Sequence, residues 1–298
     1  MTANSTQHPK QLIFAQHGWS DSGRYLGQLV RSVAPPDSEV IAPSLKFINT
    51  WLCIDWLVQE KEAIAQAALS RYPDLPVRIV GHSMGGLIWT ELLHRHPEWW
   101  ERVESFVMVG SPIGGSDMAR LIDPWGLGIG IARDLGRDRR NLAEQIAKAI
   151  PTLVIATDLG QGNDGLVAVE ATKVPGSEFR LLSDVRHSAM RYSPVVAQEV
   201  KRFWQRAKVE PEQLSPTAEQ AIRALRAVPG MTAASYRDFT RAQRCCWLGE
   251  GLTLRSWTNP AQVPHVYLAD EAGNCLFAGY VGWGHRRGLR RVLRQLSS

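Results

Sequence analysis

Residues 77–86, Val-Arg-Ile-Val-Gly-His-Ser-Met-Gly-Gly, constrain what this chain can fold into more than any other stretch. An apolar, β-branched run ends in the pattern Gly-x-Ser-x-Gly, and an apolar helical pattern begins at Leu87. A serine at a sharp strand-to-helix turn is strained, and bulky residues two positions before or after it would collide. The N-terminus of the following helix favours negative charge beside that serine. The stretch therefore predicts a strand, a tight turn that presents the hydroxyl of Ser83, and a helix.

Strand and helix patterns alternate through the first two thirds of the chain. The alternation predicts a mostly parallel sheet of about six strands with helices on both faces, an α/β fold. Strands are expected at residues 11–16, 39–42, 77–81, 103–109, 152–157 and 178–183. Helices are expected at residues 24–33, 51–72, 86–96, 141–150 and 195–207.

Residues 111–136 interrupt this alternation with a glycine-rich segment that also carries many apolar side chains. A connection this long between a strand and a helix is usually functional. We expect it to form a lid and the wall of a site for an apolar group. The alternative is that these side chains only close the core over the sheet.

A second unit is expected after residue 209. Residues 210–217 carry two prolines and predict a linker, which would separate a first domain, 1–209, from a small α+β domain, 218–298. In the second domain the patterns predict helices at about 217–228 and 232–243, a strand at 252–257, a hairpin with arms 265–269 and 275–281, and a last helix from about residue 287. The role of this domain stays open.

The positive charge of the chain is concentrated in its last part. Residues 1–214 hold 23 Lys and Arg against 24 Asp and Glu, whereas residues 215–298 hold 11 against 5. The last helix would place apolar residues on one face and, on the other, Arg287, Arg290, Arg291 and Arg294. The arginine face is expected either to stay in water or to contact an anionic membrane surface. Nucleic acid is the weaker interpretation, since the aromatic residues of the hairpin fit a core. The second domain would then modulate location or access rather than chemistry.

Composition places the protein in the cytoplasm, with peripheral membrane attachment as an option. No apolar run is long enough to span a bilayer, and the first ten residues lack an apolar signal core. Four cysteines without C-x-x-C spacing indicate reduced thiols: Cys53, Cys245, Cys246 and Cys275. No residues have the spacing of metal ligands or of a phosphate loop, so neither a metal nor a cofactor is expected.

Partners for Ser83 are expected after later strands of the sheet. A serine hydroxyl needs a base, and the base needs an acid that holds it. Because ligands bind at the carboxyl ends of parallel strands, these partners should follow such strands. Asp158 and Asp164 follow the strand at 152–157, and His187 follows the strand at 178–183. Either aspartate can be the acid on this reasoning.

The chain resembles the α/β-hydrolase family, in particular compact bacterial lipases and esterases. The resemblance covers about residues 10–207 and rests on four motifs: His17-Gly18, Gly81–Gly85, Asp164–Val167 and His187. It implies that Ser83 is the nucleophile, Asp164 the acid and His187 the base. It also implies an oxyanion hole made by two backbone N–H groups, those of Trp19 and Met84. Residues 1–209 would then be the catalytic domain.

Three other residues near these motifs receive structural interpretations. Asp158 would cap its own loop, and His17 would donate a structural hydrogen bond within the oxyanion loop. His82, directly before Ser83, is interpreted as a packing residue.

These features predict a serine hydrolase that cleaves carboxylic esters through an acyl-serine intermediate. The substrate would be a small-molecule or lipid ester, and the apolar segment 111–136 favours an apolar acyl group. A thioesterase or an amidase would use the same residues, because all three reactions share the acyl-serine step. The alternative outside the enzymes is a catalytically inactive protein with the α/β-hydrolase fold that serves as a binding protein.

Overall fold

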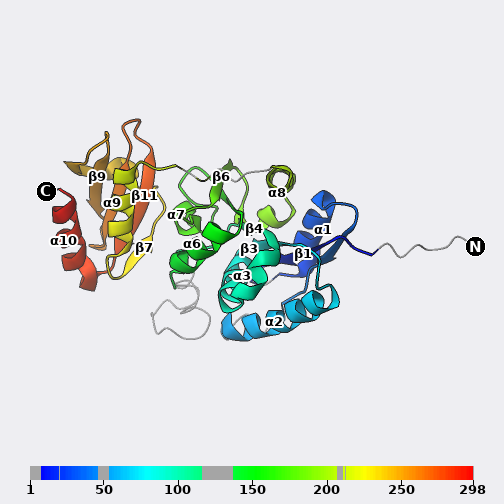
Figure 1. The fold of residues 1–298 in the computed structure, drawn as a ribbon. Helices are drawn as coiled ribbons and strands as arrows, with labels where there is room; N and C mark the ends of the chain where they lie inside the picture. Colours follow the sequence, from blue (N-terminus) through cyan, green and yellow to red (C-terminus); the bar gives the residue numbers. More distant parts are fainter. Residues whose placement is uncertain are drawn as a thin grey trace, which may run out of the picture.

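Two β-sheets organise the protein, and they lie at opposite ends of the molecule (Figure 1). The computed structural model describes residues 8–19, 21–45, 54–115, 137–206, 211 and 213–297. Most of the expected lid, residues 116–136, lies outside the described residues, and so do Cys53 and residues 210 and 212 of the expected linker.

The first sheet has six strands in the order β2-β1-β3-β4-β5-β6. All neighbouring strands are parallel, which confirms the predicted sheet. The strands are β1 (Gln11–Gln16), β2 (Ser38–Ile41), β3 (Val77–His82), β4 (Val103–Val109), β5 (Thr152–Asp158) and β6 (Glu178–Ser183).

Helices cover both faces of this sheet, as the alternation predicts. Leu12 and Phe14 of β1 are buried against one face, with α2 (Ile54–Arg71), α3 (Met84–Arg95) and α6 (Arg140–Ala149). The residues that alternate with them, Ile13 and Ala15, are buried against the other, with α1 (Gly23–Val33) and α8 (Pro194–Gln205). The short elements are η2 (Pro97–Arg102), α7 (Val169–Thr172) and η3 (His187–Tyr192).

Residues 213–297, here named the C-terminal unit, form an antiparallel sheet of five strands in the order β7-β11-β10-β9-β8. The strands are β7 (Met231–Ala233), β8 (Gln243–Trp247), β9 (Thr253–Thr258), β10 (Pro264–Ala269) and β11 (Cys275–Val281). The helices α9 (Pro216–Arg226) and α10 (Arg286–Leu296) share an apolar core with one face of this sheet. A second apolar cluster, which includes Tyr267, Tyr280 and Phe239, lies apart from it. The predicted hairpin, strand and terminal helices are confirmed.

The predicted helix at 232–243 is wrong. This segment instead holds β7, the short helix η4 (Phe239–Arg241) and the start of β8. β7 pairs with β11 and β8 pairs with β9, so the segment supplies both edges of the sheet. Backbone pairing with strands that follow later in the sequence therefore outweighs the local helical pattern.

Two further expectations concern membranes and thiols. None of the helices in the described part of the chain is both long and apolar enough to cross a bilayer. Cys245, Cys246 and Cys275 are free thiols, as predicted. The 3₁₀ helix η5 (Trp283–His285) leads into α10.

Candidate active site

Ser83 occupies a strained turn between β3 and α3. Its backbone has φ 53° and ψ −123°, a positive φ that residues other than glycine seldom adopt. A Cβ added at Gly85 would lie 2.0 Å from the backbone oxygen of Gln16, and one at Gly81 would lie 2.6 Å from the Cα of Gly86. These neighbours are backbone atoms that cannot move aside, so the turn requires both glycines. The predicted strand, turn and helix are confirmed.

The structure brings Ser83, His187 and Asp164 together. The Oγ of Ser83 lies 2.9 Å from Nε2 of His187, and Nδ1 of the same ring lies 2.6 Å from Oδ2 of Asp164. All three residues are buried. Because a carboxylate only accepts hydrogen bonds, Nδ1 carries a proton and Nε2 is left to accept the hydroxyl proton of Ser83. The imidazole is thereby oriented to act as a base toward the serine.

The second carboxylate oxygen of Asp164 is held by its own loop. Oδ1 accepts the backbone N–H groups of Leu166 at 3.0 Å and Val167 at 2.7 Å. The backbone carbonyl of Asp164 accepts the N–H of His187, with 3.0 Å between nitrogen and oxygen. Four hydrogen bonds thus fix the carboxylate and its backbone relative to the imidazole.

Asp158 lies at the end of β5 and has other partners. Its Oδ1 accepts three backbone N–H groups, those of Gly160, Gln161 and Gly162, at 2.8, 3.0 and 2.7 Å. Its Oδ2 accepts the hydroxyl of Tyr236, a residue of the C-terminal unit. The predicted loop-capping role of Asp158 is confirmed, and the Tyr236 contact is one that the sequence did not predict.

The segment that follows β1 lies directly against the serine. A Cβ added at Gly18 would be 2.7 Å from the Cβ of Ser83 and 3.3 Å from its Oγ. The buried His17 donates from Nδ1 to the carbonyl of Gly18 at 2.8 Å, as predicted, and accepts at Nε2 the N–H of Leu45. Burial lowers the pKa of His17, which keeps the ring neutral in this role.

Of the two residues expected to form the oxyanion hole, Met84 directly follows Ser83, and Trp19 follows Gly18, which lies against the serine. Trp19 follows Gly18 and packs its side chain against the core on the α3 side of the sheet. Met84 is the first residue of α3 and is buried. Met84 thus lies at the start of a helix that favours negative charge, and Trp19 lies in the segment that contacts Ser83 through Gly18.

His82 has a role that the sequence analysis missed. Its buried ring donates from Nε2 to the backbone carbonyl of His187, with 3.0 Å between the atoms. Burial, and to a smaller extent the nearby His187, lower the pKa of His82 to about 3. A neutral His82 thus ties the segment that carries His187 to the strand that leads into Ser83. No pattern in the sequence signals this contact, because the two residues are 105 positions apart.

Asp21 and α1 also hold the His187 segment. Arg191 of η3 pairs with the buried carboxylate of Asp21 at 3.3 Å and stacks over the ring of Tyr25, 5.3 Å from its centroid. Tyr192 packs on Tyr25 with 5.8 Å between ring centroids. The segment that carries His187 is therefore held by β3 through His82 and by Asp21 and Tyr25 through η3.

In the described ranges, no group of three or more His, Cys, Asp or Glu side chains could hold a metal ion.

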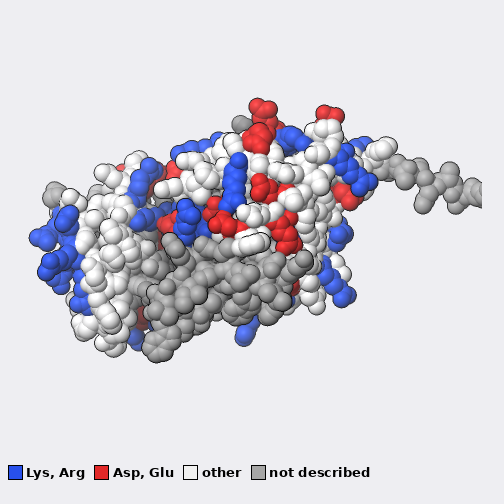
Figure 2. All heavy atoms as spheres, turned by 90° about the horizontal axis from the view of Figure 1, so that it is seen from below, with Lys and Arg blue, Asp and Glu red and all other residues white. Residues whose placement is uncertain are grey.

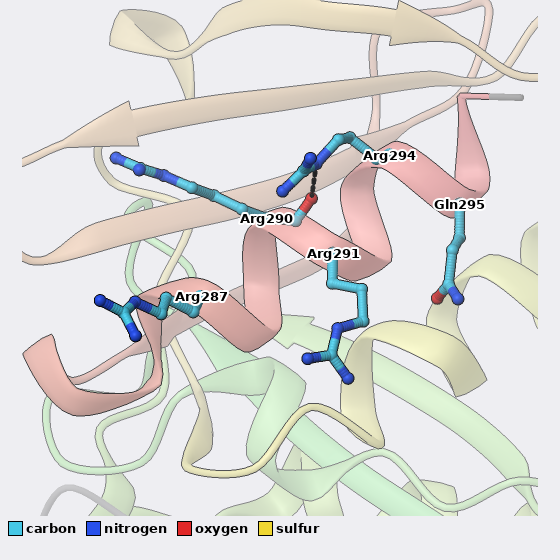
Figure 3. Close-up of a pocket in the computed structure, with 5 residues that line it drawn as sticks. All are labelled: Arg287, Arg290, Arg291, Arg294 and Gln295. Carbon is cyan, nitrogen blue, oxygen red and sulfur yellow. Dashed lines mark hydrogen bonds between the residues drawn. The ribbon is translucent and has the colours of Figure 1, made fainter.

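A basic surface lies far from this site, on α10. Four exposed arginines extend from the helix and line an open hollow of about 600 Å³ (Figure 3). They are Arg287, Arg290, Arg291 and Arg294. α10 contains no acidic residue, and none of these four arginines forms an ion pair within the described residues. Figure 2 shows the corresponding group of Lys and Arg atoms at the end of the molecule. The apolar face of the helix is not free, since Leu289 is buried in the core of the C-terminal unit.

Comparisons with known proteins agree with the architecture. The family model described as serine aminopeptidase, S33, matches residues 51–158, which include Ser83 and end before Asp164 and His187. No curated protein matches the chain. The combination of this match with the six-stranded parallel sheet and the serine turn decides the classification. The first two thirds of the chain have the α/β-hydrolase fold.

Several solved structures share the α/β-hydrolase fold. The mature form of the Bacillus licheniformis lipase BlEst2 is 15% identical, and the match covers 66% of this chain and 94% of the lipase with a TM-score of 0.50. Its propeptide form is 13% identical, over 90% of this chain and 64% of that one, with a TM-score of 0.53. The phospholipase PlaB from Legionella pneumophila is 14% identical, over 66% and 58%, with a TM-score of 0.51. At these identities the likeness establishes the fold of the α/β-hydrolase domain, which confirms the resemblance seen in the sequence.

Proposed function

We propose that the protein is a serine hydrolase that cleaves carboxylic esters. One observation carries the proposal: Nε2 of His187 lies 2.9 Å from the hydroxyl of Ser83 while Nδ1 lies 2.6 Å from Asp164. This is the geometry that a nucleophile, a general base and its orienting acid need. In this proposal Ser83 is the nucleophile, His187 the base and Asp164 the acid.

The reaction follows from the positions of these groups. The hydroxyl of Ser83 attacks the ester carbonyl carbon while Nε2 of His187 takes its proton, and the carboxylate of Asp164 stabilises the resulting imidazolium. We propose that the backbone N–H groups of Trp19 and Met84 bind the oxyanion. Such donors typically contribute about 10²–10³ in rate each. The imidazolium then protonates the leaving alcohol, and water activated by His187 releases the acid from the acyl-serine.

An ester with an apolar acyl group is the substrate class that we favour. The similar structures reported above are named as a lipase, in two forms, and as a phospholipase. The apolar composition of residues 111–136, which we propose as the lid and acyl wall, points the same way. Thioester and amide hydrolysis remain the alternatives within the same mechanism, and an inactive binding protein is the alternative of another class.

A panel of chromogenic substrates separates these alternatives. Esters of p-nitrophenol with increasing acyl length are compared with acyl thioesters and anilides at equal concentration. We expect the highest kcat/KM for esters, rising with acyl length. Faster turnover of thioesters or anilides would assign the alternative reaction, and a flat chain-length profile would contradict the acyl wall at 111–136.

We also propose that the arginine face of α10 contacts an anionic membrane surface, so that the enzyme works as a cytoplasmic, peripheral protein. The observation that favours this partner is the set of four exposed arginines that form no ion pair within the described residues. Free thiols at Cys245, Cys246 and Cys275 suit a reducing compartment. In this arrangement residues 1–209 are the catalytic domain and residues 218–298 a separate domain that docks.

A further inference from the structure

The loop that carries Asp164 is packed between the α/β-hydrolase sheet and the C-terminal unit. We name residues 158–168 the acid loop. At its C-terminal end Val167 is buried in a small apolar cluster with Ala171 of α7 and Ala233 of β7. In its middle, Gly162 lies so close to Tyr236 that an added Cβ would be 2.6 Å from the backbone nitrogen of that tyrosine. Residues of the C-terminal unit therefore form one wall of the acid loop.

The acid loop needs such a wall because its backbone is permissive. Gly160, Gly162 and Gly165 have φ values of +91°, +78° and +91°, and nothing lies within 4 Å of a Cβ built at Gly160. Glycines with positive φ leave many other conformations open to a free loop. Contacts from outside the loop must select the conformation in which Oδ2 of Asp164 meets His187.

Asp158 and Tyr236 supply one such contact at the start of the loop. One carboxylate oxygen of Asp158 accepts hydrogen bonds from the backbone N–H groups of residues 160–162, and the other accepts a hydrogen bond from the hydroxyl of Tyr236. This ordered first half of the loop also holds the residue next to Asp164, because the backbone N–H of Leu159 donates to the carbonyl of Asn163 across 2.9 Å. The ring of Tyr236 is itself packed in the second apolar cluster of the C-terminal unit.

Ion pairing fixes the segment that follows the loop. The buried carboxylate of Glu170 in α7 pairs with Arg226 of α9 at 2.6 Å, and Arg140 of α6 lies 3.8 Å away. Lys173 donates to the backbone carbonyl of Leu276 at 3.2 Å. The C-terminal unit thus contacts the acid loop at its first residue, Asp158, and also contacts α7, the helix that follows the loop.

We propose that Tyr236 is a positioning residue for the triad, so that the C-terminal unit takes part in catalysis and does not only direct location or access. Its hydroxyl holds Asp158, Asp158 holds the first half of the acid loop, and the ordered loop keeps Asp164 in contact with His187. The inference rests on the proposed function of Ser83, His187 and Asp164. It assigns to the C-terminal unit a role that the sequence did not predict.

The test removes the hydroxyl and keeps the ring, by Tyr236→Phe in the full-length protein. We expect kcat on a short soluble ester to fall about tenfold with KM nearly unchanged. The matched control is Tyr267→Phe, since the hydroxyl of Tyr267 is buried without a hydrogen-bond partner in the described part of the chain. Its loss should leave kcat unchanged. Hydrogen exchange of the peptide that contains residues 158–168 should be faster in Tyr236→Phe alone.

A double-mutant cycle with Asp164→Asn separates positioning from general destabilisation. If Tyr236 acts through Asp164, adding Tyr236→Phe to Asp164→Asn lowers kcat by less than about twofold. Equal losses in both backgrounds would overturn the proposal, and so would wild-type kcat and wild-type exchange in Tyr236→Phe. Failure of the proposed function looks different, because the wild-type protein would then have no esterase activity to lose.

Discussion

His82 donates a hydrogen bond from its Nε2 to the backbone carbonyl of His187, across 3.0 Å in the buried centre of the protein. The two rings lie with 5.0 Å between their centroids. A charged His82 would repel the imidazolium that the proposed mechanism forms on His187, so that mechanism requires a neutral ring at position 82. The burial that lowers the pKa of His82 to about 3 satisfies this requirement.

The lowered pKa of His82 predicts acid destabilisation that one substitution removes. Between pH 6.5 and about 3 the unfolded chain binds a proton at His82 that the folded protein does not, so stability falls as the pH falls. One such proton changes the unfolding free energy by about 1.4 kcal/mol per pH unit, or roughly 2 kcal/mol between pH 7 and pH 5. Urea unfolding at both pH values should show this loss for the wild type.

His82→Gln is expected to lose stability at pH 7 but to depend less on pH. Its loss between pH 7 and pH 5 should be smaller than that of the wild type by roughly 2 kcal/mol. His94→Gln, at the exposed end of α3, is the control and should follow the wild type. Equal pH dependence in His82→Gln and the wild type would refute the buried, neutral state of His82.

Asp164 and Asp158 should differ sharply when each is changed to asparagine. Asp164→Asn cannot stabilise the imidazolium, and its amide favours the wrong tautomer of His187, so kcat should fall by about 10³–10⁴. Asp158→Asn keeps an oxygen that accepts hydrogen bonds and should lose less than about tenfold. Steady-state kinetics on a short ester, with unfolding curves to confirm the fold, decides between them. A larger loss of kcat in Asp158→Asn than in Asp164→Asn would show that Asp158, and not Asp164, is the acid.

The arginine face of α10 predicts binding to anionic vesicles that salt reverses. Near an anionic surface each arginine contributes about 1 kcal/mol. The full-length protein should therefore co-sediment with phosphatidylserine vesicles at about 0.1 M salt and be released at about 1 M, where screening is short-ranged. Changing Arg287, Arg290, Arg291 and Arg294 to glutamine should abolish binding.

A second variant controls for the loss of net charge alone. It changes four residues of the α/β-hydrolase fold to glutamine: Arg31, Arg71, Lys148 and Lys201. It removes the same charge from exposed positions and should still bind. Equal loss of binding in both variants would make net charge the cause, and no binding by the wild type at low salt would leave the arginine face as a solvated surface.

The first sheet was predictable because its signals are local. Apolar runs such as Gln11–Gln16 and Val103–Val109 alternate with helical patterns, and prolines at 97 and 151 mark their limits. The prediction of a helix at 232–243 was wrong for the opposite reason. β7 forms on the edge of β11, far along the chain, and β8 pairs with the edge of the following strand, β9. A pattern read within one window contains no information about such edges.

The candidate site divides in the same way. The turn at Ser83 is encoded locally by its glycines, whereas the choice of Asp164 over Asp158 depended on the family resemblance. The local contacts, those of His17 with Gly18 and of Asp158 with its own loop, were predicted, but the long-range contacts that hold the site were not. His82 meets His187 across 105 positions, and Tyr236 meets Asp158 across 78. Both pairs depend on how separate elements pack, which no local spacing records.

Covalent labelling of Ser83 tests the central claim most directly. A fluorophosphonate reacts with a serine that a neighbouring base activates, and peptide mapping then locates the adduct. We expect one adduct, on the peptide that contains Ser83, and its loss in Ser83→Ala and His187→Ala. Ser188→Ala, an exposed serine beside the base, should label like the wild type. Folded protein that stays unlabelled, or that labels equally well without Ser83, would contradict the account.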